Sequence, residues 1–351
     1  MKAIPYEKRV QLGAEVPSAG QFAVMARIPQ FGAPEVYRAS LAQKPAPETI
    51  RAAVFTVEHG TRIREIVSFL ETCPALKDAD ILFGNELDDG TERSGNINAS
   101  RKIAEALGYQ YAYALEFIEL VNPNDRKGYE GNTLFSRWPI VRAEALSLPE
   151  AYNWYFDEQK RIGARVAVFC ELDVAGTRIG AVCVHLENRT TPALRAKQTE
   201  AILEKAAAMF PGLPVLIGGD FNTNAFDYGE SAALSAYQRQ KTDGIVVDPV
   251  PFEPLFACAE KAGFDYRSLN GMCVPTRRRP TGDGVLELHL DWIFARGIAC
   301  VRHGVVSTLM KDCDWADAAS PLRAAGFSEL SDHNAVWADF RLHTQRAQES
   351  G

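Results

Sequence analysis

The sequence lacks the features that mark membrane-inserted and secreted proteins. No apolar run approaches the roughly 20 residues that a helix needs to cross a bilayer. The opening residues, MKAIPYEKRV, contain no uninterrupted apolar core after a basic start, so no secretory signal is visible. We therefore expect a cytoplasmic protein without a membrane span.

A strong charge of either sign and paired cysteines are also absent. The 351 residues carry a net charge of −7, which gives no global attraction to nucleic acid or to an anionic membrane. The seven cysteines are odd in number, form no CxxC pair and lie mostly in apolar context, which favours buried, reduced thiols. With 46% apolar and 24% charged residues, the chain has the composition of a folded globular protein.

Strand patterns recur from residue 51 onwards. Gly84 is expected to end the strand Ile81–Phe83. Ala175-Gly176-Thr177 is predicted to form the turn of an antiparallel hairpin between the strands Arg165–Leu172 and Arg178–Leu186. The strand candidates are Ala52–Val57, Ile81–Phe83, Arg165–Leu172, Arg178–Leu186, Pro214–Ile217, Leu288–Ala295 and Ala335–Phe340.

Helix patterns alternate with these strands. Apolar residues at helical spacing predict a helix from Ile63 to Leu70, and a second helix is expected from a cap at Asn96 to Leu107. A third begins at Thr191, followed by proline at the first helical position, and runs to about Phe210. Because a tight hairpin interrupts the alternation, we predict an α/β fold of two packed mixed sheets flanked by helices.

The chain shows no repeat and no internal linker. Residues 1–50 carry several prolines and no strong periodicity, so we interpret them as an N-terminal extension or an accessory strand. Residues 51–343 are assigned to one domain, and residues 344–351 to a C-terminal tail.

Several strand candidates end in polar side chains suited to phosphate or metal chemistry. Glu86 follows a strand and offers the oxygen donors that magnesium or manganese prefers, although a surface turn is the plainer interpretation of this residue alone. His185 ends an apolar strand, where a lone histidine is more often a satisfied turn residue. Asp220 and Asn222 follow two glycines after a buried strand, and in extended geometry they would point to the same side.

Two further acidic residues lie near the C-terminus of the chain. Asp291 stands inside an apolar strand, where a buried charge needs a partner. Asp332 and His333 supply candidates, since a carboxylate fixes the tautomer of an imidazole and stabilises its charged form. A structural ion pair is the alternative.

The order of these residues resembles the endonuclease/exonuclease/phosphatase superfamily. That superfamily includes magnesium-dependent DNases, abasic-site endonucleases, sphingomyelinases and inositol polyphosphate 5-phosphatases. The resemblance spans residues 51–340 and rests on GGDFNT at 218–223, LDWIF at 290–294, SDH at 331–333 and GNTLFSR at 131–137. It implies a four-layer α/β/β/α sandwich and a catalytic domain over residues 51–343.

The resemblance implies a role for each motif residue and a Mg²⁺ or Mn²⁺ cofactor. Glu86 looks like the metal-binding glutamate, and His185 like the histidine that contacts the scissile phosphate or assists the leaving group. Asp220 resembles the residue that positions or deprotonates the attacking water, and Asn222 the donor that holds a phosphate oxygen. Asp291 would pair with His333, and Asp332 would lie near the metal.

One position departs from the family pattern. The first strand of the family commonly ends in an asparagine close to the metal, and Thr56 stands there in this chain. Glu58, two residues later, is predicted to share the metal site and to supply the missing oxygen donor.

The implied activity is a phosphodiesterase or phosphatase reaction on an unidentified phosphoester. Asn132, Arg93 and Asn96 are assigned to substrate binding. The run Arg277-Arg278-Arg279 is read as a solvated charged loop, with binding of extra phosphates as the alternative.

Two rival functions stay open. A metal- or phosphate-binding module that kept the fold but lost turnover is the first, and Thr56 is its only support. A nuclease is the second, although the acidic balance does not favour nucleic acid as a partner. The sequence predicts neither the substrate nor the oligomeric state.

Overall fold

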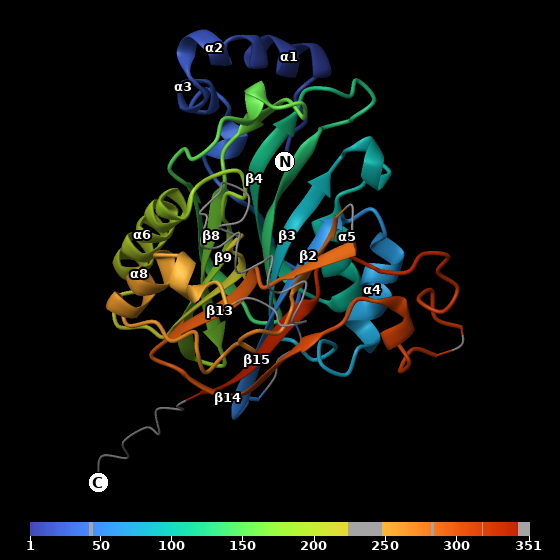
Figure 1. Cartoon of the computed structure of the whole chain (residues 1–351), viewed down its shortest axis with the longest axis vertical. Helices are drawn as coiled ribbons and strands as arrows, with labels where there is room; N and C mark the ends of the chain where they lie inside the picture. Colours follow the sequence, from blue (N-terminus) through green and yellow to red (C-terminus); the bar gives the residue numbers. More distant parts are fainter. Residues whose placement is uncertain (42–44, 224–247, 282–283, 318, 343–351) are drawn as a thin grey trace.

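Two β-sheets are stacked face to face between outer layers of helices, which gives the four-layer α/β/β/α sandwich (Figure 1). The computed structural model describes residues 1–41, 45–223, 248–281, 284–317 and 319–342. The domain boundaries expected at residues 50 and 343 stay a proposal, and residues 344–351 lie outside the described chain.

The first sheet contains the candidate site residues that come earliest in the sequence, Glu58 and Glu86. Strands β2 and β3 are parallel and the other pairs are antiparallel, so the sheet is mixed. In spatial order its strands are β1 (Glu35–Tyr37), β4 (Gln110–Glu119), β5 (Tyr129–Ser136), β3 (Ile81–Asp89), β2 (Thr49–His59), β15 (Ala335–Arg341) and β14 (Ala299–Val306), with β7 (Arg161–Gly163) pairing with β4.

The second sheet is also mixed, since β9 and β10 are parallel within it. Its spatial order is β13 (Asp291–Arg296), β10 (Val215–Asp220), β9 (Thr177–His185), β8 (Val166–Val174) and β6 (Ile140–Ser147). A separate hairpin of β11 (Arg277–Thr281) and β12 (Gly284–Leu288) precedes β13.

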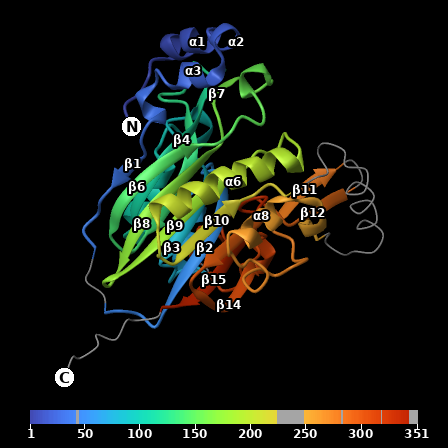
Figure 2. The ribbon, with the colours of Figure 1, turned by 90° about the vertical axis from the view of Figure 1, so that its left-hand side faces the viewer.

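Three apolar clusters hold the layers together. One fills the space between the two sheets, where side chains such as Val54, Phe83 and Ile293 are fully buried. The outer face of the first sheet is covered by α4 (Ile63–Thr72) and α5 (Ala99–Leu107). Figure 2 shows α6 (Pro192–Met209) and α8 (Leu255–Lys261) over the second sheet. Removal of this apolar surface from water is the main stabilising contribution.

The N-terminal residues form a helical cap at one end of the sandwich (Figure 1). We define this N-terminal cap as residues 5–31, with α1 (Tyr6–Ala14), α2 (Val16–Ala19), α3 (Gln21–Met25) and the 3₁₀ turn η1 (Pro29–Phe31). The accessory strand expected in this region is β1, a short edge strand. Further 3₁₀ turns are η2 (Glu92–Ser94), η3 (Trp154–Phe156), η5 (Val250–Phe252) and η6 (Met310–Asp312).

Two local predictions are wrong. The strand does not end at Gly84 but continues to Asp89, because a bulge lets the chain pass Glu86 and resume pairing with β5. Asn96 does not cap α5; its side chain bonds the backbone of Asn124 and Arg126 instead. The cap is Asn98, whose side-chain oxygen accepts the amide of Arg101 at 2.7 Å.

The burial expected of the cysteines holds for four of the seven, since Cys258 and Cys300 are half-buried and Cys273 is exposed. All seven cysteines are free thiols, and the four fully buried ones are Cys73, Cys170, Cys183 and Cys313. In the described part of the chain, no helix has the length and apolar character that a membrane crossing demands.

Candidate active site

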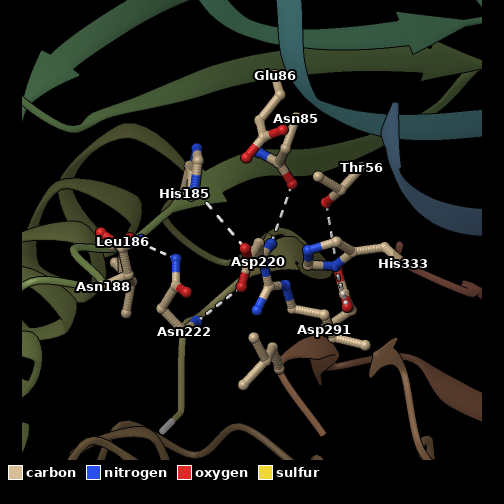
Figure 3. Close-up of polar contacts among 12 residues, drawn as sticks. Thr56, Asn85, Glu86, His185, Leu186, Asn188, Asp220, Asn222, Asp291 and His333 are labelled. Carbon is tan, nitrogen blue, oxygen red and sulfur yellow. Dashed lines mark hydrogen bonds and ion pairs between the residues drawn. The ribbon is translucent and has the colours of Figure 1, made fainter. Parts of the chain in front are cut away.

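Three neighbouring strands of the second sheet place His185, Asp220 and Asp291 in one row. Asp220 stands opposite His185 in the parallel β9–β10 pair and opposite Asp291 in the antiparallel β10–β13 pair. His185 Nε2 lies 3.6 Å from Asp220 Oδ2. Figure 3 shows Asp220 between His185 on one side and the Asp291–His333 pair on the other. The fold therefore gathers residues that are more than a hundred positions apart in sequence.

The Asp291–His333 pair is the buried contact that the sequence motifs required. His333 Nδ1 lies 2.8 Å from Asp291 Oδ2, and both side chains are almost completely buried. Burial alone would lower the pKa of His333, but Asp291, Asp332 and Asp220 raise it to about 10. The imidazole is thus held as a cation at neutral pH.

Thr56 supports this pair. Its hydroxyl donates to Asp291 Oδ1 at 3.3 Å, as Figure 3 shows. Its carbonyl accepts the hydroxyl of Ser331 at 2.7 Å, and the Ser331 oxygen in turn accepts the His333 amide at 3.1 Å. Thr56 therefore fixes the position of Asp291 and of the segment that carries His333.

Asp220 occupies an enclosed position. Its backbone amide donates to Asn85 Oδ1 at 3.0 Å, which ties the end of β10 to β3 across the two sheets. A Cβ on Gly219, whose φ is +149°, would lie 1.9 Å from the Val184 carbonyl, so only glycine permits this approach. Burial and the neighbouring Asp291 raise the pKa of Asp220 to about 6.

Asn222 does not continue an extended strand beside Asp220, contrary to the sequence prediction. Its φ is +47°, in the left-handed region, so the chain turns after Phe221. The Asn222 amide donates to Asp220 Oδ1 at 2.8 Å, and its side-chain nitrogen donates to the Leu186 carbonyl at 2.9 Å. The turn thus lets the Asn222 amide orient the Asp220 carboxylate, while the Asn222 side chain bonds the residue that follows β9.

His185 rests on two residues that the sequence reasoning missed. Its Nδ1 lies 3.3 Å from Glu116 Oε2, and Arg165 Nη1 donates to Glu116 Oε1 at 2.7 Å. Burial and Arg165 lower the pKa of His185, while Glu116 and Asp220 raise it, and the net shift is upward. Glu116 is a buried charge between the apolar residues Leu115 and Phe117 of β4, and that signal called for a buried partner.

Glu86 and its neighbours supply oxygen donors close to this row. The backbone bulge gives Glu86 a φ of +57° and turns its side chain away from the strand register. Its Oε2 lies 4.0 Å from His59 Nε2. Burial raises the pKa of Glu58, with further upward contributions from Asp332 and Glu86, so these three carboxylates lie within electrostatic reach of one another.

Other contacts already engage two of the three predicted metal ligands. Glu58 is 39% exposed and pairs with Arg62 at 2.6 Å. Asp332 Oδ2 accepts Arg277 Nη2 at 2.9 Å. Glu86 is left as the carboxylate with the weakest engagement, which suits direct contact with a hard cation.

A second cluster of potential metal ligands lies beside Glu86. His59, Asp88 and Glu130 each bring one ligand atom within 4.8 Å of the others. Arg93 already binds both oxygens of Asp88 at 2.8 Å and Glu130 at 2.8 Å. These carboxylates are therefore compensated by a guanidinium, and a metal ion here would have to displace it.

The three residues predicted to bind substrate have other partners. Arg93 is held by the carboxylates just described, and Asn96 bonds the 124–126 backbone. Asn132 is fully buried and bonds Asn85 and Glu116, so it links the supports of Asp220 and His185. Contact between Asn132 and a substrate stays a prediction that this burial disfavours.

The arginine run is not a solvated loop, because it forms strand β11. Arg278 is buried and donates to Glu329, Thr308 and the Ser331 carbonyl. Arg277 faces the opposite way and reaches Asp332. The alternating direction of side chains along a strand explains this division.

Comparison with solved structures identifies the fold. An endonuclease/exonuclease/phosphatase from Beutenbergia cavernae aligns at 18% identity over 84% of this chain and 72% of that chain, with a TM-score of 0.53. The human Nocturnin catalytic domain with bound sulfate anion aligns at 16% identity over 90% and 98%, with a TM-score of 0.53. D. rerio TDP2 complexed with single strand DNA product aligns at 14% identity over 84% and 100%, with a TM-score of 0.50. Identities this low show a shared fold and no more.

Comparison by sequence identifies the family. No curated protein matches the chain. The profile of the Endonuclease/Exonuclease/phosphatase family matches residues 57–333, which is most of the sequence. The sequence motifs and the row of His185, Asp220 and Asp291 lie within that match. The chain belongs to the endonuclease/exonuclease/phosphatase family.

Proposed function

We propose that the protein is a divalent-metal-dependent phosphoester hydrolase in which water attacks phosphorus in line with the leaving group. The observation that carries the proposal is the placement of Asp220. It stands between a histidine with an upward-shifted pKa and a buried Asp291–His333 pair, with the Glu86 carboxylate nearby. Such a site combines a base, cationic donors and oxygen ligands in one enclosed space.

The residues that would hold the metal are Glu86, with Asp332 and Glu58 at the margin of the site. Their carboxylate oxygens match the preference of Mg²⁺ and Mn²⁺ for hard donors. When bound, the cation would neutralise phosphate charge and help to lower the pKa of a water molecule.

Asp220 is the proposed general base. Its pKa of about 6 lets the carboxylate be ionised at neutral pH while it remains basic enough to accept a proton from water. The Asn222 backbone amide donates to Oδ1 at 2.8 Å, so Oδ2, which lies 3.6 Å from His185 Nε2, is the oxygen proposed to accept the proton. The side chain thus has a fixed orientation before substrate enters, which reduces the cost of ordering it.

His333 and His185 are proposed to donate hydrogen bonds to the phosphate. His333 is a cation at neutral pH, so it stabilises negative charge on phosphate oxygens rather than acting as the base. Asp291 and Thr56 hold it in place. His185, backed by Glu116, would donate to a phosphate oxygen or to the leaving group.

An anionic phosphoester is the substrate class that fits these donors. Two structures with the same fold were solved with anions, sulfate in Nocturnin and a single strand DNA product in TDP2. These ligands belong to those proteins, and they support the substrate class here only as analogy. Diester and monoester substrates both remain within the proposal.

A screen for hydrolysis with Mg²⁺ or Mn²⁺ tests the proposal. It compares a generic phosphodiester, a phosphomonoester, single- and double-stranded DNA, RNA and a phospholipid, each with and without chelator. Turnover that disappears on chelation is expected for at least one class. A protein that binds Mn²⁺ and phosphate but turns over none of them would instead be a binding module, and full activity after thorough chelation would exclude the metal-dependent mechanism.

Two glutamine variants test the metal ligands directly by calorimetry. Glu86→Gln should weaken Mn²⁺ binding by at least ~10-fold, because a carboxylate ligand is replaced by a neutral amide. Glu58→Gln should weaken it less, since Glu58 is already paired with Arg62. Equal Mn²⁺ affinity in Glu86→Gln and the parent protein would remove Glu86 from the site.

A further inference from the structure

Arg277 is held beside the candidate active site by a contact of its own backbone and by contacts of its neighbour Thr276. The preceding residue, Thr276, accepts the amides of Leu290 and Asp291 on its hydroxyl, at 2.8 and 3.0 Å. On the other side, Arg277 forms a β-bridge with His333. The root of the β11–β12 hairpin is thus fixed to both catalytic segments, so the position of Arg277 relative to the Asp291–His333 pair is set by the fold.

The guanidinium of Arg277 faces the carboxylates of the site. Burial alone would lower its pKa, but Asp332, Asp220 and Glu86 raise it. Its Nη2 donates to Asp332 Oδ2 at 2.9 Å. Its Nε and Nη1 have no acceptor among the described residues, and the side chain is 25% exposed. A fixed cation with spare donors therefore lies beside the proposed base.

Phosphate needs such a cation because the site is rich in carboxylates. Asp332 and Glu86 act electrostatically on Glu58, and both act with Asp220 on Arg277, so four carboxylates would repel an anionic ester in this region. Arginine presents several N–H donors in a planar fork that matches two phosphate oxygens, and it stays charged at any working pH. Asp332 accepts a hydrogen bond from Nη2, which leaves Nε and Nη1 as donors for separate phosphate oxygens.

We infer that Arg277 is a catalytic residue that donates from Nε or Nη1 to a non-bridging oxygen of the scissile phosphate while Asp332 holds Nη2. This inference rests on the proposed function, because it names a further residue of the same site. The neighbouring Arg278 has a different role, because Glu329, Thr308 and Ser331 take up its donors and it fixes the backbone.

Binding of inorganic phosphate, measured by calorimetry at saturating Mg²⁺, tests the inference without turnover. Arg277→Ala should weaken phosphate binding at least ~10-fold, and Arg277→Lys should restore part of it, since lysine keeps the charge but loses the fork. Arg142→Ala is the matched control, because Arg142 also lies on a strand and pairs with one carboxylate, Glu144. The control should bind phosphate like the parent.

Magnesium affinity and turnover separate the inference from a purely supporting role. Removal of the guanidinium should not weaken Mg²⁺ binding, because Asp332 loses a competing cation, whereas kcat on a phosphodiester should fall ~100-fold. If Arg277→Ala binds phosphate like the parent but loses Mg²⁺, then Arg277 only orders Asp332 and the inference is wrong.

Failure of the inference is distinct from failure of the proposed function. Absence of phosphate binding by the parent protein would overturn the role of Arg277. Phosphate binding that depends on Arg277, in a protein that hydrolyses no ester, would overturn the hydrolase while the Arg277 contact stands. Unchanged thermal unfolding of Arg277→Ala ensures that any loss is local.

Discussion

At the scale of single residues, Asp220 and His333 are the two groups on which the proposed chemistry depends most. Asp220→Asn and His333→Ala should each lower kcat at least ~100-fold, since one removes the base and the other a cationic donor. Their double variant should lose less than the product of the two, because both act on one water and one phosphate. Steady-state kinetics on a phosphodiester provide the measurement.

The matched control for Asp220→Asn is Asp173→Asn. Asp173 lies in β8, at the turn of the β8–β9 hairpin, whereas His185 lies at the far end of β9. The Asp173 side chain accepts a hydrogen bond from the Gly176 amide. Its substitution removes the same charge far from the site and should leave kcat within about twofold of the parent value, as most surface changes do. Strictly multiplicative losses in the double variant would assign Asp220 and His333 to separate steps.

The raised pKa of His333 predicts a pH dependence of stability. Its folded pKa of about 10 lies above the ordinary value of 6.5, so the contribution to the free energy of unfolding is fully present below pH 6.5 and is lost as pH rises toward 10. A pKa difference of one between the folded and unfolded states corresponds to about 1.4 kcal/mol, which allows a few kcal/mol in all.

Urea unfolding of the chelated protein at pH 6.5 and 8.5 measures this effect. The parent should lose stability over this interval by more than ~1 kcal/mol relative to His333→Gln, which has no titrating group at this position. Parallel pH dependences of parent and variant would show that Asp291 does not hold His333 as a cation.

At the scale of secondary-structure elements, the N-terminal cap is anchored by one arginine. Arg9 is fully buried, and its guanidinium donates to the carbonyls of Glu119 at the end of β4 and of Asp125 and Lys127 in the β4–β5 loop. Arg9→Met should lower the free energy of unfolding by ~2–4 kcal/mol, because three carbonyls lose a charged donor.

The control for Arg9 is Arg27→Ala in the same cap. Arg27 pairs with Glu15 on the surface, with both side chains nearly half exposed, so its loss should cost no more than about 0.5 kcal/mol. Urea denaturation measures both variants. Equal stabilities for Arg9→Met and Arg27→Ala would mean that the cap does not brace the β4–β5 loop.

Sequence reasoning located regular elements better than irregular ones. The hairpin around Ala175-Gly176 follows from local turn chemistry, and the helix after Thr191 follows from proline at its first position. The structure contains both, although the Thr191 side chain makes no capping hydrogen bond. The bulges at Glu58 and Glu86 were not foreseen, because they depend on pairing with strands distant in sequence. The helices of the N-terminal cap were missed for a similar reason, since their apolar residues pack against β4 and β7 rather than repeating regularly.

The candidate site was predicted unevenly for the same reason. Motif residues at strand ends were visible as patterns, and the Asp291–His333 contact is present at 2.8 Å. Glu116 was not visible as a partner of His185, because it belongs to the other sheet and reaches the histidine only when the two sheets stack. Arg165 directly precedes β8, the neighbour of β9, and it pairs with Glu116 across the sheets. The hydrogen bond from Thr56 to Asp291 likewise joins residues 235 positions apart.

At the scale of the whole molecule, the acidic balance bears on substrate choice. A net charge of −7 gives no global attraction to nucleic acid, and Arg278 of the arginine run is committed to internal contacts. Long DNA is therefore not expected to be the preferred substrate. Catalytic efficiency should be lower on duplex DNA than on small diesters or monoesters at moderate salt. A clear preference for duplex DNA that weakens steeply with salt would overturn this expectation.

The most direct test of the hydrolase mechanism is the fate of solvent oxygen. A phosphoester that the protein turns over is hydrolysed with Mg²⁺ or Mn²⁺ in ¹⁸O-labelled water, and both products are analysed by mass spectrometry. Attack of water on phosphorus predicts one labelled oxygen in the phosphate-containing product and none in the released alcohol. Label in the alcohol, or no product from any phosphoester at saturating metal, would contradict the account.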